Sequence, residues 1–398
     1  ESDFLDRKID DSRLRFNVSS LGYVLAKNRR QKSGFVGASF ALGYQSLINY
    51  NQRSTMSGTN MQSSMLDEFT WRANEDPDNL DPFYEQVAFD AGLLPYDSIA
   101  GEFWNDIQDG GYGQAQSRLV DQRGYVGEYS MSGALNFGNF LYFGATFGIH
   151  SVRFYEEIYH SESDPGNDLL YFDSFDFSEF NNTYGWGYTF RFGMILRPFQ
   201  ALRIGGTFQI PTYYYLTDEK YTDAYSTWDR TTGWEDGQGT SPWGVYDYKL
   251  KSPIRANAHA SVILFKLATI SASYEYVDYS SARLDSYNDR FVDQNEAIRQ
   301  ELQDAHNLKA GAELRMGSLY FRGGMQYLMS PYSDSRNDAD AFIYSAGMGV
   351  RTQRAFLDVS YSRGITHQVY GLYDPGAGVP ESSFIAQNTV HPNNLMIT

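Results

Sequence analysis

The sequence predicts an all-β fold, a transmembrane antiparallel β-barrel, and three observations lead to that prediction. Many segments of about ten residues are apolar at every second position, as lipid-facing barrel strands are. The connections between these segments alternate between short and long along the chain. No stretch reaches the roughly 18 consecutive apolar residues that a membrane-spanning helix needs. We therefore treat residues 1–398 as a single barrel.

The composition supports this class and excludes others. The 398 residues include 32 Tyr, 27 Phe and 6 Trp, and the mean hydropathy is −0.48. No cysteine is present, so the fold contains neither a disulfide nor a thiolate metal site. The net charge of −17 argues against nucleic acid as a partner, because nucleic-acid binding requires a basic face.

The segment 186–199, WGYTFRFGMILRPF, shows the alternation most clearly. Trp186, Tyr188 and Phe190 share one face of a strand, and Thr189 and Arg191 share the other. In a water-soluble sheet the aromatic face would be the inside. In a membrane barrel it faces lipid and Arg191 points into the lumen, which is the arrangement that we predict.

Thirteen strands are predicted along the chain. Their ranges are 11–27, 34–51, 121–136, 140–155, 170–197, 200–216, 242–265, 267–283, 306–316, 318–330, 339–352, 354–369 and 387–398. Single-chain bacterial barrels have an even number of strands, so we expect fourteen, with one upward strand preceding Glu1.

Short and long connections alternate along the chain. In outer-membrane barrels this places the tight turns at one end of the barrel and the long loops at the other. Short turns are expected near residues 29–33, 137–139, 198–199, 266, 316–317 and 353. Long loops are expected over 52–121, 156–169, 217–241, 284–305, 331–338 and 370–386. Tyrosine and phenylalanine gather beside the long loops, where an interfacial aromatic girdle lies.

The insertion at 52–120 is predicted to be an extracellular loop that contains three short helices. Ser64 caps the first, with Asp67 three residues on; Asp81 caps the second, with Pro82 at its first position; Ser98 caps the third. Their apolar stripes are a candidate ligand-binding platform, for which we name Leu66, Phe69, Phe83, Val87, Phe103 and Trp104. The alternative is that the helices form a lid and the stripes are its own small core.

The polar and charged side chains that alternate with the apolar ones are predicted to point into the lumen. The predicted inward set is Arg15, Glu128, His150, Arg191, Arg203, Arg255, His259, Glu275, Lys309, Glu313, Arg315, Arg322, Arg351 and Asp358. Arg191, Arg203 and Arg255 are the candidates for an anion site that holds a carboxylate head group. The alternative is a ladder of opposite charges across neighbouring strands, which fills the lumen without binding a ligand.

Stretches such as NRRQKSGFVGASFALGY, GWGYTFRFGMILRPF, LRIGGTFQIPTYYYLTDEKY and SASYEYVDYSSARL resemble the FadL family, in the version found in Bacteroidetes. The resemblance implies a fourteen-stranded barrel of the bacterial outer membrane that transports long-chain fatty acids and other hydrophobic compounds, with a hatch inside and sideways release. This sequence lacks the hatch and its NPAG-type motif. The hatch shapes the ligand pocket in the family, so its absence bears directly on transport.

Two functions follow from these features. The first is passive binding and transport of hydrophobic small molecules, with membrane lipid and the ligand as partners. The second is a non-transporting barrel subunit of an outer-membrane secretion or assembly complex, with other outer-membrane proteins as partners. No elbow, triad, nucleotide-binding or metal-binding pattern is present, so we expect no enzymatic activity, no cofactor and no metal.

Overall fold

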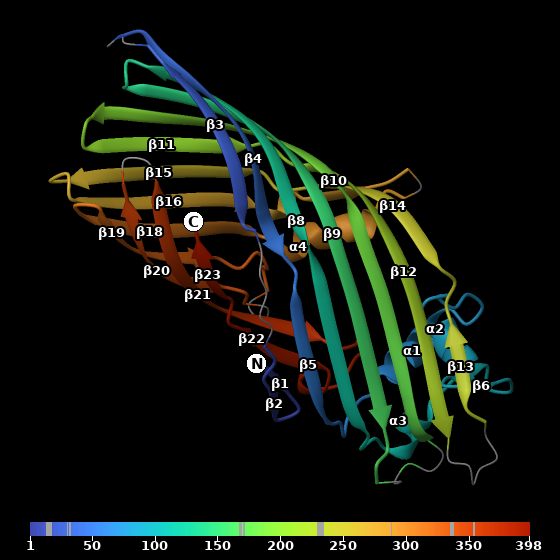
Figure 1. Cartoon of the computed structure of the whole chain (residues 1–398). Coiled ribbons are helices and arrows are strands. Elements are labelled where there is room, and N and C mark those ends of the chain that lie inside the picture. The colour runs from blue at the N-terminus through green and yellow to red at the C-terminus, as the bar shows by residue number, and fades with distance from the viewer. Residues whose placement is uncertain are drawn as a thin grey trace.

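A computed structural model describes residues 1–12, 18–29, 31, 33–166, 169, 172–228, 235–287, 289–334, 338–352 and 355–398. Arg15 and the turn residue Gln353 lie outside this part of the chain, so their predictions are not tested. In the described residues a large antiparallel sheet curves around on itself to form the wall of a barrel (Figure 1). None of the helices there has the length and apolar character needed to cross a membrane.

The strands follow one another along the chain with few interruptions. Their bounds are β1 Ser2–Phe4, β2 Arg7–Ile9, β3 Ser20–Asn28, β4 Phe35–Asn49, β5 Gln52–Thr59, β6 Tyr96–Asp97, β7 Glu102–Phe103, β8 Ala115–Phe137, β9 Leu141–Ser163, β10 Phe172–Phe199, β11 Leu202–Gln209, β12 Tyr213–Trp228, β13 Gly237–Thr240, β14 Gly244–Lys251, β15 Arg255–Leu264, β16 Ala268–Asp278, β17 Arg283–Asp285, β18 Asp304–Met316, β19 Leu319–Leu328, β20 Ala341–Arg351, β21 Phe356–Gly371, β22 Ile385–Val390 and β23 Asn393–Ile397. The helices are α1 Met65–Glu75, α2 Glu85–Asp90, α3 Asp106–Gly110 and α4 Val292–Glu301, with short 3-10 turns at η1 Tyr279–Ser281 and η3 Glu381–Ser383.

The strands of the wall pair in the order in which they occur along the chain, and the shorter strands between them lie nearer the long loops. The order at the end with short turns is β3–β4–β8–β9–β10–β11–β15–β16–β18–β19–β20–β21–β23. These thirteen strands correspond one to one with the thirteen predicted from the alternation. The expectation of an all-β antiparallel barrel is confirmed.

The outer face of the wall is apolar, as predicted. Tyr188, Phe190 and Phe192 are each about half exposed, and Phe190 has 44% of its surface accessible. The same belt continues around the barrel through Tyr129, Met131, Leu135, Phe143, Ile204, Phe208, Leu308, Phe321, Phe342, Tyr344 and Met348. Exposed aromatic and aliphatic side chains in such number are unfavourable in water and favourable against hydrocarbon.

Two edges of the sheet remain within the described residues. β3 pairs only with β4, and β23 pairs only with β21. Counting alternate strand directions around the wall, β3 and β23 run the same way, so a strand between them would be antiparallel to both. The gap between β3 and β23 lies at the end with short turns. Nearer the long loops, β1 pairs antiparallel with β22, with Ser2 opposite Asn388. The fourteenth strand itself stays a prediction.

The wall extends further toward the long loops than the sequence analysis predicted. β5 pairs with β8 from Gln52 to Thr59, so the insertion spans 60–114 rather than 52–120. β9 continues to Ser163 in the predicted loop 156–169, and β12 continues to Trp228 in the predicted loop 217–241. These loop boundaries were wrong because the extensions have polar residues on both faces, so the alternation of an apolar with a polar face does not identify them as strands.

The helices of the insertion match the predictions in part. Ser64 caps α1 and forms a capping box with Asp67, as expected. α2 begins at Glu85 rather than at Pro82, although Asp81 still accepts the backbone N–H of Phe83. α3 is capped by Asn105, and Ser98 caps no helix. The segment around Ser98 is instead the β6–β7 hairpin, with Ile99 at its tip 97% exposed.

Candidate functional site: the helical insertion and the barrel lumen

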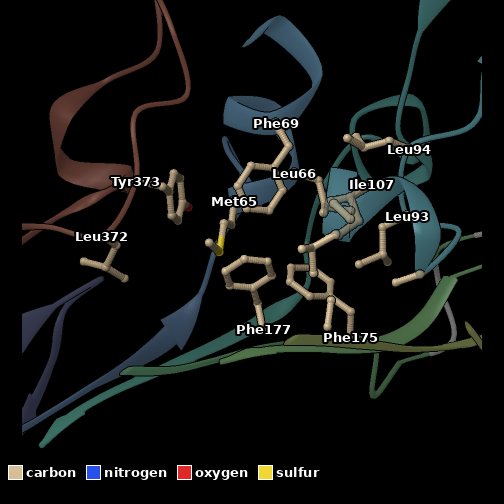
Figure 2. Packing of buried hydrophobic residues seen from close by; sticks show 14 of the residues in the cluster. Met65, Leu66, Phe69, Leu93, Leu94, Ile107, Phe175, Phe177, Leu372 and Tyr373 are labelled. Carbon is tan, nitrogen blue, oxygen red and sulfur yellow. The ribbon is translucent and has the colours of Figure 1, made fainter. Parts of the chain in front are cut away.

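The helical insertion packs against the inner face of the wall at the long-loop end. α1, α2 and α3 lie together at the ends of β8, β9, β10 and β12 (Figure 1). Figure 2 shows Phe175 and Phe177 rising from the sheet toward Leu66, Phe69 and Ile107, with Leu372 and Tyr373 arriving from the last long loop. These side chains form one closed hydrophobic core.

The predicted platform residues lie mainly inside this core. Leu66 and Val87 are each 1% exposed, and Phe69 and Phe103 are also buried. Phe83 and Trp104 are half-buried. The structure therefore shows the stripes packed as the core of a lid rather than as an open groove. Ligand binding by these residues stays a prediction, and it requires the helices to move away from the wall.

Close approach between helix and sheet is permitted by a glycine. A side-chain carbon at Gly239 of β13 would lie 2.0 Å from the carbonyl oxygen of Val87 in α2. Only a residue without a side chain fits where two backbones come this close. This contact holds α2 against the strand that pairs with β12.

A buried polar network fixes the start of α1 to the wall. The Glu162 carboxylate of β9 accepts the Ser64 hydroxyl at 2.7 Å and the backbone N–H of Met65 at 2.8 Å. Gln114 and Gln116 also donate to it, each at 3.0 Å. A carboxylate with 0% exposure requires such donors, because an unpaired buried charge is costly. No local sequence pattern indicates this site, because its members come from distant segments.

Burial also shifts the acidity of two carboxyls in the insertion. Desolvation raises the pKa of Asp67 to about 6, against the hydrogen bonds that it accepts from Ser64, Asn105 and Tyr112. Desolvation likewise raises the pKa of Asp106 to about 6, with a smaller contribution from nearby Asp109. The lid is therefore held less tightly when these groups are charged.

Below the lid the lumen contains a cavity of about 990 Å³. Its inward-facing lining combines cations, anions and hydroxyls: Glu128, His150, Arg191, Tyr214, Arg255, His259, Glu275 and Lys309. Between lid and cavity lies a second apolar layer of Val126, Val152 and Leu216, with Tyr50, Tyr214 and Tyr248 against it. The cavity is large enough for a small organic molecule.

The lumen cations are largely paired with carboxylates. Arg191 donates to Glu128, which also contacts His150 Nε2 at 2.9 Å. Arg255 and Lys309 lie 3.8 and 3.3 Å from Glu275. This is the arrangement of the charge-ladder alternative. Arg203 does not line the cavity, so of the three anion candidates the structure brings together only Arg191 and Arg255.

The described residues thus define a membrane-type barrel with a helical insertion packed on the inner face of its wall at the long-loop end and a polar cavity in its lumen. Among solved structures, a FadL homologue from Pseudomonas aeruginosa matches with a TM-score of 0.51 and 12% identity, over 94% of this chain and 76% of that one. The fold of the chain is therefore the FadL-type fold.

Two further solved structures share less of the geometry. The toluene transporter TbuX of Ralstonia pickettii matches with a TM-score of 0.43 and 12% identity, over 95% of this chain and 86% of its own. The toluene transporter TodX of P. putida matches with a TM-score of 0.46 and 9% identity, over the same shares. No protein-family profile and no curated protein sequence matches the chain. Assignment to a Bacteroidetes-type member stays a prediction.

Proposed function

We propose that this chain is a barrel of the bacterial outer membrane that binds hydrophobic small molecules, such as long-chain fatty acids, and passes them through passively. The observation that carries the proposal is the combination of an apolar outer belt with a lumen cavity of about 990 Å³ beneath a closed lid. The FadL-type fold supports it, since the resemblance implies this class of transport.

The closed lid shapes the proposed route. Leu66, Phe69 and Phe177 are buried together, so a ligand that uses the platform first displaces apolar side chains from one another. Apolar ligand surface replaces the contacts that are lost, at roughly 25 cal/mol per Å² of buried area. The Asp67 carboxyl weakens the lid when it is charged, which favours opening near neutral pH.

Two neighbouring residues of β9 provide a matched test. Both residues border the cavity, but the Thr146 hydroxyl bonds to Ser132 at 2.9 Å on the lumen side, whereas Ala145 is exposed on the outward face that contains Phe143. We expect Thr146→Trp to reduce uptake of a labelled long-chain fatty acid several-fold in a host lacking its own fatty-acid channel, because the indole fills the conduit. Ala145→Trp, with the same side chain toward lipid, should transport like the parent.

Equal uptake by both variants and by the host without the barrel would overturn the transport proposal. If the barrel then co-purified in fixed ratio with other envelope proteins, the role as a subunit of an assembly or secretion complex would replace it.

A further inference from the structure

The outer wall changes character where it leaves the apolar belt. Outward-facing residues that pair across neighbouring strands form rows around the wall. The row next to Trp186, on the side of the long loops, consists of Tyr125 in β8, Arg153 in β9 and Tyr184 in β10. Arg123 and Tyr155 form the following row. Further along come the row of Asp121 and Glu157, the row of Leu119 and Tyr159, and then the hydroxyls Ser117 and Ser161. Aromatic residues with cations between lipid-facing and water-facing zones mark a membrane interface.

A groove of about 580 Å³ lies in this band, lined by Arg123, Gly124, Tyr125, Arg153 and Tyr155 together with Asp121 and Glu157. At Gly124 the backbones of β8 and β9 come so close that a side-chain carbon would lie 2.1 Å from the carbonyl oxygen of Arg153, and φ is +127°, so only glycine fits. Near this residue the partner of β8 changes from β4 to β5.

The two arginines of the groove differ in their partners. Arg123 is held by Asp121 at 2.8 Å and Glu157 at 3.4 Å. Arg153 forms no ion pair within the described residues, and its guanidinium carbon lies 5.3 Å from the ring centre of Tyr184. Stacking orients the guanidinium but leaves its charge without a counter-anion. Arg153 is therefore the cation in the groove that is available to a ligand.

The position of Arg153 selects the ligand. An anion that binds at Arg153 is adjacent to the apolar belt on the side of the short turns, and to polar wall on the other side, where Asp121 and Glu157 are held by Arg123. A molecule with an anionic head and acyl chains fits both zones at once, and guanidinium is well suited to phosphate. We propose that this groove binds the headgroup of an anionic phospholipid, one with a net negative charge, with Arg153 as the anion contact and Tyr125 and Tyr155 beside it. The inference rests on membrane placement of the barrel, not on transport.

Lipid retention by the purified full chain tests the proposal. We would titrate detergent-solubilised protein with phosphatidylglycerol or phosphatidylcholine and measure bound lipid by native mass spectrometry. One cation near a membrane surface contributes an affinity factor of about fivefold, so Arg153→Gln should bind phosphatidylglycerol about fivefold more weakly than the parent. Arg153→Lys should keep part of the affinity, which separates charge from folding.

The control is Arg299→Gln, which removes an exposed arginine of α4 that pairs with Glu296 outside the groove. It should bind lipid like the parent, and so should Thr146→Trp, so failure of transport and failure of this site are distinguishable. Unchanged phosphatidylglycerol binding by Arg153→Gln, or equal binding of phosphatidylcholine by the parent, would overturn the proposal. Displacement of the lipid by millimolar inorganic phosphate would also overturn it, because the groove would then be a site for the free anion.

Discussion

A single strand, β10, contains two regions of opposite polarity. In its part nearer the short turns, Trp186, Tyr188 and Phe190 point outward and are exposed, and Arg191 points inward. In its part nearer the long loops, Phe175 and Phe177 point inward and are buried, and the positions that alternate with them are Ser174, Asp176 and Ser178. The alternation has period two in both regions, but the apolar face changes sides.

The difference shows that alternation reveals that a strand has an apolar face, but what surrounds the strand decides whether that face points outward or inward. Where hydrocarbon covers the outside, the outward positions are apolar and the lumen is wet. Where the wall rises beyond the belt and a helical lid fills the inside, the inward positions are apolar and the outside is polar. Each region can be perturbed separately, and the expected effects differ in size.

The largest effect is expected in the buried core of the lid. Phe177→Ala should destabilise the packing of the helices on the wall by roughly 3–5 kcal/mol, because a fully buried phenyl ring leaves a cavity. Limited proteolysis within 60–114 and hydrogen exchange of α1 would measure the loosening. Phe192→Ala, on the lipid-facing part of the same strand, is the control and should leave the lid protected. Similar protease sensitivity in both variants would contradict the division of β10 into two regions.

A smaller but decisive effect is expected in the belt. Phe190→Arg should disfavour membrane insertion by roughly 2–4 kcal/mol, because it places a charge against hydrocarbon, whereas Arg191→Ala changes only the lumen. Refolding into lipid vesicles across a urea series would measure both. If the two variants inserted equally well, the outer and inner faces would have been assigned the wrong way round.

The smallest effect is a pH dependence confined to the lid. The pKa of Asp67 in the folded protein is raised to about 6 by burial, above its ordinary value of 3.8. The folded state therefore binds this proton more strongly, and the stability of the lid should increase as pH falls from about 7 to about 4. Asp67→Asn imitates the protonated form, so the stability of its lid should not increase as pH falls from about 7 to about 4. The measurement is proteolytic protection of α1 between pH 4 and 7, compared between parent and variant at each pH. A parent-to-variant difference that did not change with pH would exclude a raised pKa at Asp67.

Much of the wall could be predicted from the sequence because each strand contains its own information. Period-two alternation over ten residues located the thirteen strands, and Ser64 with Asp67 located the start of α1. Both signals are local: a side-chain periodicity and a cap three residues long. The extensions of β9 and β12 lie in predicted loops because polar residues occupy both of their faces, and no local pattern reveals the segments that pack on them.

The candidate sites were predictable to a smaller degree. Arg191 and Arg255 line the lumen cavity, and their role as anion ligands stays a prediction, whereas their pairing with Glu128 and Glu275 depends on which strands are neighbours. The platform stripe was correctly identified as apolar, but its burial depends on Phe175 and Phe177, about a hundred residues further along. The Glu162 network and the groove at Gly124 had no local signal at all.

The sequence by itself determined the class of fold, because a strand in lipid must alternate and a barrel must keep its turns short at one end. Tertiary structure alone decided that the helices of the insertion close over the wall and that the lumen charges neutralise one another. The physical reason is that periodicity is a property of a single segment. Burial and ion pairing are properties of segments brought together from distant parts of the chain.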